Sequence, residues 1–236
     1  MLNWGILSET GRKPIVLFVF QQMIKFWWHV KDSKSHIVKN ALKASRDLSD
    51  NGHKSWFSAI TKICRWLGYD FLLNNEYQLT TKKLKAELNR KFDQVWSLHR
   101  KSVLNSPDSK LHLFAQLNES FSKSVHIDII KNYKIRNSVS RFRLSAHNLP
   151  IERLRYLNIP RNMRFCPFCC SEVGDEKHFF MDCQATDIVN SRNQLPLSLS
   201  DQNPYDEMVT VLKTVQPEKL LAVGNHIRTI ELFLKE

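Results

Sequence analysis

Four potential metal ligands lie within 18 residues of the sequence, and their spacing constrains the fold more than any other feature. The segment 166–183 reads CPFCCSEVGDEKHFFMDC, in which Cys166 and Cys169 form a C-x2-C pair and His178 and Cys183 form an H-x4-C pair. The first pair fits a knuckle turn, and the second is separated by about one helical turn, so all four can face one ion. Three thiolates and one imidazole predict a closed, structural zinc site whose metal supplies the folding free energy of a segment with almost no core.

The first cysteine pair can be placed in two registers. Cys170 follows Cys169 directly, so a C-x3-C-x7-H-x4-C pattern through Cys170 is the alternative to the preferred pattern through Cys169. Four of the five cysteines lie in this one segment. That concentration favours a metal site in a reducing, intracellular compartment over a disulfide framework. The remaining interpretation is a group of reduced core cysteines beside an unrelated histidine.

Hydrophobic spacing predicts a mainly α-helical chain. Residues 56–67 carry apolar side chains at i, i+4, i+7 and i+11, with Gly68 as the C-cap, and residues 84–103 continue the same spacing. Pro14 fits the first turn of a helix that runs to Val30, and residues 69–79 suit a hairpin or loop. We expect an irregular helical array, then a small zinc knuckle and a C-terminal helix over 220–234. The domains follow as 1–130, 131–184 and 185–236.

Positive charge is concentrated just before the first cysteine. The chain has 35 Lys and Arg against 23 Asp and Glu, and residues 131–165 hold nine of the basic residues and one acidic residue. Arginine suits phosphate because its planar fork donates two parallel hydrogen bonds. The sequence therefore predicts a phosphate-binding surface, and the alternative is that the arginine stems pack around a docked helix. The predicted contact residues are Lys134, Arg136, Arg141, Arg143, Arg153, Arg155, Arg161 and Arg164.

The stretch RFRLSAHNLPIERLRYLNIPRNMRFCPFC, followed by EKHFFMDC, resembles the C-terminal region of non-LTR (LINE-type) retrotransposon reverse transcriptases, including their cysteine–histidine zinc-binding knuckle. The resemblance is strongest over 131–184 and extends to the N-terminal WGILSETGRKPI and to the closing helix. It implies zinc held by Cys166, Cys169, His178 and Cys183, and RNA or DNA bound through the phosphate backbone. It also implies a reverse transcriptase core in trans as a partner, and a nuclear or cytoplasmic ribonucleoprotein.

Catalytic motifs are missing from the sequence. There is no aromatic-x-Asp-Asp polymerase signature, no restriction-like nuclease arrangement, no Gly-x-Ser-x-Gly elbow and no Gly-rich phosphate loop. We expect a binding fragment without enzymatic activity, small-molecule substrate or membrane span. Asp175 and Glu176 are expected to cap the turn before His178 or to orient its imidazole. A zinc-stabilised protein–protein interaction module and an inert retroelement remnant are the alternative functions.

Overall fold

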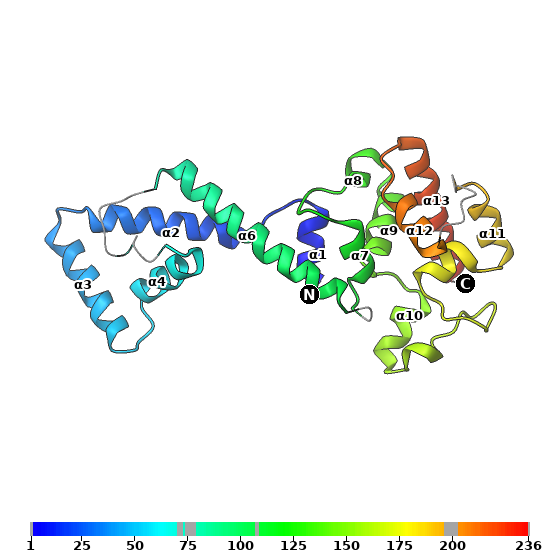
Figure 1. Ribbon diagram of the computed structural model, residues 1–236, viewed down its shortest axis with the longest axis horizontal. Helices are drawn as coiled ribbons and strands as arrows, with labels where there is room; N and C mark the ends of the chain where they lie inside the picture. The colour runs from blue at the N-terminus through cyan, green and yellow to red at the C-terminus, as the bar shows by residue number, and fades with distance from the viewer. Residues whose placement is uncertain (1, 70–72, 74–78, 107–108, 196–202, 236) are drawn as a thin grey trace. The chain divides into compact units, whose positions relative to one another are not determined.

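The computed structural model describes residues 2–69, 73, 79–106, 109–195 and 203–235, and these are mainly helical (Figure 1). Helices account for 68% of the structure, which confirms the predicted mainly α class. Within the described residues there is no strand, and the isolated sheet-like pairing is an antiparallel bridge between Phe165 and Val173. No helix in these ranges has the length and apolarity needed to cross a membrane.

The chain forms two compact units. The small unit comprises residues 13–98, and the large unit comprises residues 1–12 together with 99–236. The predicted domain boundaries after residues 130 and 184 both lie inside the large unit, so the compact units follow a different division. The first 12 residues belong with the C-terminal half because their partners lie there, and no local pattern in the sequence marks such a long-range contact.

The small unit is built from α2 (Ile15–Lys31), α3 (His36–Asp50), α4 (Trp56–Leu67) and the first part of α6 (Thr81–Leu104). Ser55 and Ser58 form a reciprocal capping box at the start of α4, and Gly68 ends the helix with a φ of 81°. The predicted helix over 56–67 and its C-cap are therefore confirmed. The predicted loop at 69–79 falls mostly outside the described residues. The buried core includes Ile24, Trp27, Ile60, Cys64, Leu84 and Leu88.

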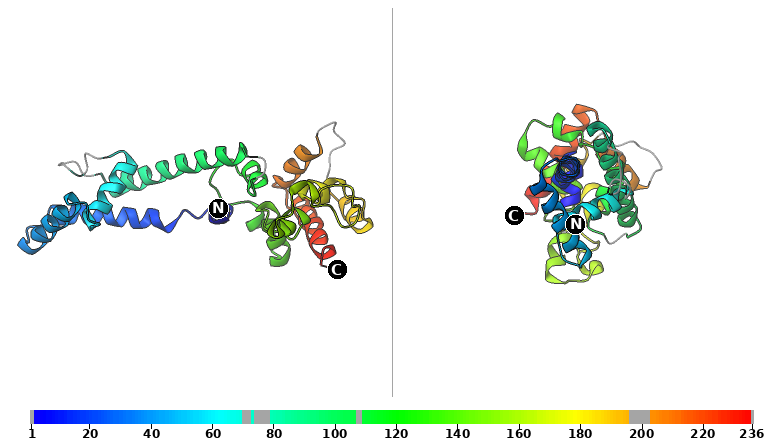
Figure 2. Two further views of the ribbon diagram at one scale, coloured as in Figure 1. Left: turned by 90° about the horizontal axis from the view of Figure 1, so that it is seen from below. Right: turned by 90° about the vertical axis from the view of Figure 1, so that its left-hand side faces the viewer.

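In the large unit, the other helices pack around α9 (Tyr133–Arg143) and α13 (Pro217–Phe233), which lie side by side (Figures 1 and 2). Val139 and Phe142 of α9 are buried, as their apolar spacing predicts, against the face of α13 that carries Val223 and Ile227. α13 corresponds to the C-terminal helix that the sequence predicts over 220–234. The helices of this unit are α1 (Leu2–Glu9), the end of α6, α7 (His112–Leu117), α8 (His126–Ile129), α9 (Tyr133–Arg143), α10 (Pro150–Arg153), α11 (Thr186–Arg192), α12 (Pro204–Leu212) and α13 (Pro217–Phe233).

Gly224 lets α9 and α13 approach closely. A Cβ at this position would stand 2.5 Å from Ile135 Cγ2, well inside van der Waals contact. We expect Gly224→Ala to destabilise the large unit by about 1–3 kcal/mol through overpacking, which outweighs the roughly 1 kcal/mol that alanine gains in helix propensity. Urea unfolding measures the change. Asn225→Ala, at an exposed position of the same helix, is the control and should not lower stability.

Candidate metal centre and basic surface

Three of the predicted ligands come together in the large unit. The donor atoms of Cys166, Cys169 and His178 all lie within 4.8 Å of one another, a group that can hold a metal ion. Cys169 Sγ is 3.5 Å from His178 Nε2. Cys183 is buried nearby, with its Sγ 4.0 Å from Cys166 Sγ, but it falls outside the group of three mutually close donors.

Two of the donor separations are close to those of a tetrahedral ion. A tetrahedral site with metal–sulfur bonds of about 2.3 Å and metal–nitrogen bonds of about 2.1 Å has sulfur–sulfur edges of about 3.8 Å and sulfur–nitrogen edges of about 3.5 Å. The Cys166–Cys183 separation is 4.0 Å and the Cys169–His178 separation is 3.5 Å. Soft sulfur and imidazole donors suit zinc better than magnesium or calcium, which take oxygen ligands. The donor set therefore has the soft ligand chemistry that zinc prefers.

Cys166 and Cys169 lie in a tight turn between the bridged residues Phe165 and Val173. The Cys166 amide donates to Glu172 O at 2.8 Å, and the Gly174 amide donates to Arg164 O at 2.9 Å, which closes the turn at its base. Inside the turn, backbone amides of Phe168 and Cys169 donate to the Cys166 sulfur. This ring of N–H donors is the arrangement that stabilises thiolate ligands, because each donor favours the charged form.

The two thiols of the turn differ in acidity. Burial raises the pKa of Cys166 to about 12, whereas hydrogen bonding from the Ser171 side chain and from backbone amides lowers the pKa of Cys169 to about 6. Cys169 thus offers a ready thiolate at neutral pH. Cys166 needs a compensating cation before it ionises in its buried position, and metal coordination supplies one.

Cys170 points away from the metal-capable group. It is exposed, its sulfur contacts Pro167 O at 3.7 Å, and its φ of 54° lies in the left-handed region that glycine tolerates best. Cys170 therefore occupies the turn position that redirects the chain after the second ligand. This geometry favours the C-x2-C register through Cys169.

His178 is oriented by two carboxylates. Its backbone amide donates to Asp175 Oδ1 at 2.9 Å, so Asp175 caps the turn as predicted. Its Nδ1 lies 2.9 Å from Glu172 Oε2, which leaves Nε2 directed at the sulfur of Cys169. No sequence pattern singles out Glu172, because its contact with His178 exists only once the turn has folded.

Glu176 does not orient the metal-site imidazole. Its Oε1 accepts from the Ser145 hydroxyl at 2.6 Å and from His147 Nε2 at 2.9 Å. Burial alone would raise the pKa of the Glu176 carboxyl, but the charge and hydrogen bond of His147, together with the Ser145 hydroxyl, lower it to about 2. Through these two hydrogen bonds, Glu176 links the turn after α9 to the metal-binding segment.

Arg143 is buried, which corrects its prediction as a phosphate contact. The residue is 5% exposed, and its Nε donates to Glu9 Oε1 at 2.9 Å. Its remaining donors reach Asn118 Oδ1 at 3.0 Å and Leu212 O at 3.1 Å. Glu9 is further bonded by the Ser124 hydroxyl at 2.6 Å. Arg143 thus joins α1 to the rest of the large unit, and its guanidinium is buried away from any ligand at the surface.

Three other predicted arginines are half-buried and bond to backbone carbonyls. Arg136 Nη1 donates to Ile130 O at 3.1 Å, and Arg141 Nε donates to Ala146 O at 2.9 Å. Arg164 donates to Ile159 O at 2.8 Å and to Ile151 O at 2.7 Å. The alternative interpretation, in which arginines support a docked helix, describes this group better than the phosphate-binding one.

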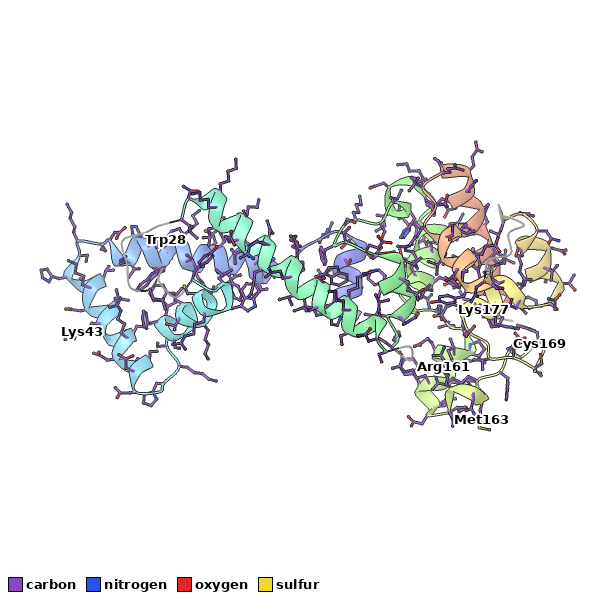
Figure 3. The ribbon with its side chains drawn as sticks, in the orientation of Figure 1. Trp28, Lys43, Arg161, Met163, Cys169 and Lys177 are labelled. Carbon is purple, nitrogen blue, oxygen red and sulfur yellow. The ribbon has the colours of Figure 1, made fainter. Side chains whose placement is uncertain are left out.

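Four predicted cations remain at the surface. Lys134 lies on α9, and Arg153, Arg155 and Arg161 lie on residues 150–164, here called the basic loop, which includes the two short 3-10 turns Leu154–Leu157 and Arg161–Met163 (Figure 3). Among the described residues, Lys134 and Arg153 have no carboxylate within ion-pair distance, whereas Arg155 lies 3.5 Å from Glu152 Oε1.

No family model, curated protein or solved structure matches the chain. The resemblance to non-LTR reverse transcriptases therefore stays a prediction.

Proposed function

We propose that the protein is a nucleic-acid-binding module whose basic loop is held in place by a structural zinc site. The observation that carries this proposal is the attachment of the loop to the metal-binding turn at both ends. The Ile151 amide donates to Gly174 O at 3.1 Å. At the other end, the Arg164 carbonyl accepts from the Gly174 amide, and Arg164 is two residues before Cys166. Metal binding would therefore fix the base from which the loop's arginines project.

Zinc in this proposal is bound by Cys166, Cys169, His178 and Cys183. Four protein ligands fill a tetrahedral site and leave no position for water or substrate, so the metal has a structural role and no catalytic one. The carboxylate of Glu172 sets the ring orientation of His178, and the buried position of Cys166 and Cys183 excludes solvent from two ligands.

The nucleic-acid contact is proposed to lie on the basic loop. Arg153, Arg155 and Arg161 are exposed and can each donate two hydrogen bonds to a phosphate. Tyr156, 76% exposed between them, offers a ring for base stacking. Glu152 is buried, and its carboxylate lies 3.2 Å from Lys110 Nζ and 3.5 Å from Arg155 Nη1. Together with the resemblance, this surface supports RNA or an RNA/DNA hybrid as the ligand, with a reverse transcriptase core in trans.

The test of this surface is the salt dependence of binding. Changing Arg153, Arg155 and Arg161 together to serine is expected to reduce the slope of log affinity against log salt by about 2–3, because each lost phosphate contact removes a little under one released counterion. Fluorescence anisotropy with labelled single-stranded RNA measures it. The matched control changes the exposed Lys101, Lys219 and Lys235 to serine, which lowers the net charge equally. Equal slopes in the two variants would contradict the proposal.

A protein-docking role is the second candidate, and exposed apolar side chains favour it. Leu157, Met163, Phe165 and Phe168 are all exposed around the basic loop. A surface of this kind also suits a protein partner such as a polymerase core. Under this alternative, Leu157→Asp with Met163→Asp abolishes partner capture, while the triple arginine variant retains it.

A further inference from the structure

Most of the unbalanced positive charge belongs to the small unit, which the proposed function leaves unused. Residues 13–98 contain 15 Lys and Arg against seven Asp and Glu, a net charge of +8. The large unit contains 20 against 16, a net charge of +4, because acidic residues elsewhere in it offset the Arg-rich segment. A unit of fewer than 90 residues with this excess has a strong positive field.

A groove in the small unit collects part of this charge. It has a volume of about 730 Å³, and its lining residues come from the end of α3, the connecting loop and α4. Figure 1 shows these elements of the backbone. Its basic lining residues are His53, Lys54, Lys62 and Arg65, and Asp50 is its acidic residue among those described. We call this feature the α4 groove.

Helical spacing explains why the cations share one side of α4. Lys62 and Arg65 are three residues apart and follow Ser58 and Thr61 on the same face, in line with Lys54 at the start of the helix. The opposite face carries Ile60, Ile63, Cys64 and Leu67, all of which are buried. Burial of that face against the core therefore turns the cationic face outward.

The lysines of the groove are not neutralised by neighbouring acids. Lys54 and Lys62 are exposed, and among the described residues neither has a carboxylate within ion-pair distance. This contrasts with the basic loop, where Glu152 and Asp175 lie near Arg155 and Arg161. Two lysines without carboxylate partners in one concave site repel each other, and a bound polyanion relieves that repulsion.

We propose that the α4 groove binds a nucleic-acid phosphodiester backbone, as a second contact besides the basic loop. The span from residue 56 to residue 65 is about 14 Å long at 1.5 Å per residue. That length exceeds the width of one phosphate group, so the row of cations suits successive phosphates of a strand better than a single phosphate. None of the described lining residues is an exposed large hydrophobic, whereas a membrane-binding face requires such side chains.

The inference deepens the proposed function and rests on it only for the class of ligand. The two surfaces lie in different units and share no residue, so each can be removed alone. A chain with both contacts would hold one strand at two places, or two strands at once. Either arrangement gives the small unit a direct part in binding.

The experiment uses the full chain and labelled single-stranded RNA. Changing Lys54, Lys62 and Arg65 to serine is expected to lower the slope of log affinity against log salt by about 2–3 and to weaken binding about tenfold at low salt. The matched control changes Lys39, Lys43 and Lys85, which are exposed cations of the same unit outside the groove, and Lys43 lies on the side of α3 away from α4 (Figure 3). The control should lower the slope by less than about 1. Circular dichroism confirms that both variants are folded.

A combined variant separates the two proposals. It carries the groove substitutions together with the serine substitutions of Arg153, Arg155 and Arg161. If the arginine variant still binds RNA weakly and the combined variant does not, the groove inference is supported. If the groove variant binds like the wild type while the arginine variant does not, the groove inference is wrong and the proposed function stands. If the arginine variant binds normally and the groove variant does not, the proposed contact at the basic loop is wrong and the groove inference is supported.

Two further measurements can overturn the groove inference independently. Bound RNA should slow amide hydrogen exchange over residues 54–65, and unchanged exchange there would contradict it. Phosphatidylserine vesicles should not compete with RNA for the wild-type chain. Competition that disappears in the groove variant would make the site a membrane contact instead.

Discussion

Cys166→Ser is expected to abolish metal binding and to unfold residues 160–185 while the helices of the small unit remain intact. Cys166 is fully buried, adjoins both Cys169 and Cys183, and supports the turn through its amide. Zinc contributes roughly 10–16 kcal/mol of apparent binding free energy to small zinc domains, so its loss removes more than the local core can replace. Metal analysis of tag-free protein should fall from about one zinc per chain to none, and hydrogen exchange should accelerate across the segment.

Cys170→Ser is the matched control for this prediction. Its sulfur faces Pro167 O and its backbone is left-handed, so replacing it should leave both metal content and exchange unchanged. Cys170→Gly should be equally well tolerated, because glycine prefers the same φ. A protein that keeps its metal after Cys169→Ser and loses it after Cys170→Ser would instead establish the C-x3-C register.

Glu9→Ala is expected to destabilise the large unit by about 3–5 kcal/mol, because it leaves the buried guanidinium of Arg143 without its counter-ion. Glu9 and Arg143 are both nearly fully buried, and Ser124 and Asn118 complete the same hydrogen-bonded group. The loss in free energy of unfolding is measured by chemical denaturation, monitored with a signal that comes from the large unit. The double variant Glu9→Leu with Arg143→Met should recover much of the stability, because no charge then remains buried.

An exposed ion pair of the same unit provides the control. Glu119 pairs with Lys213 at 2.9 Å and is 73% exposed, so Glu119→Ala should leave the free energy of unfolding essentially unchanged. Equal effects of Glu9→Ala and Glu119→Ala would contradict the buried network. The network also makes Arg143→Glu unsuitable as a probe of nucleic-acid binding, because it would place two carboxylates together in the core.

Local patterns predicted the helices and three of the residues that form the metal-capable group. The apolar spacing of α4, its cap at Gly68 and the buried stripe of α9 depend only on residues within a few turns of each other. The donors of Cys166, Cys169 and His178 meet because a short turn joins them. In each case the physical cause lies inside one segment, where sequence spacing is a direct guide to geometry.

Long-range contacts explain what the sequence could not provide. Arg143 belonged to a run of basic residues and was expected to face solvent, but its partner Glu9 lies 134 positions earlier. Net charge along the sequence likewise pointed to residues 131–165, whereas folding brings acidic residues such as Glu176 and Glu231 into the same unit. Charge becomes informative about a ligand only after the neighbours of each cation in space are known.

The placement of α1 makes the large unit a discontinuous domain with the small unit as an insertion. Residues 1–12 and 99–236 fold together, and Glu9 is the residue through which the early segment reaches the buried arginine. A fragment that begins at residue 99 or at residue 131 would expose the Arg143 site and lose its counter-ion. A minimal, stable form of the metal-binding half must therefore keep both segments and replace residues 13–98 with a linker. Excision of that kind, rather than truncation, is the route to a separate domain.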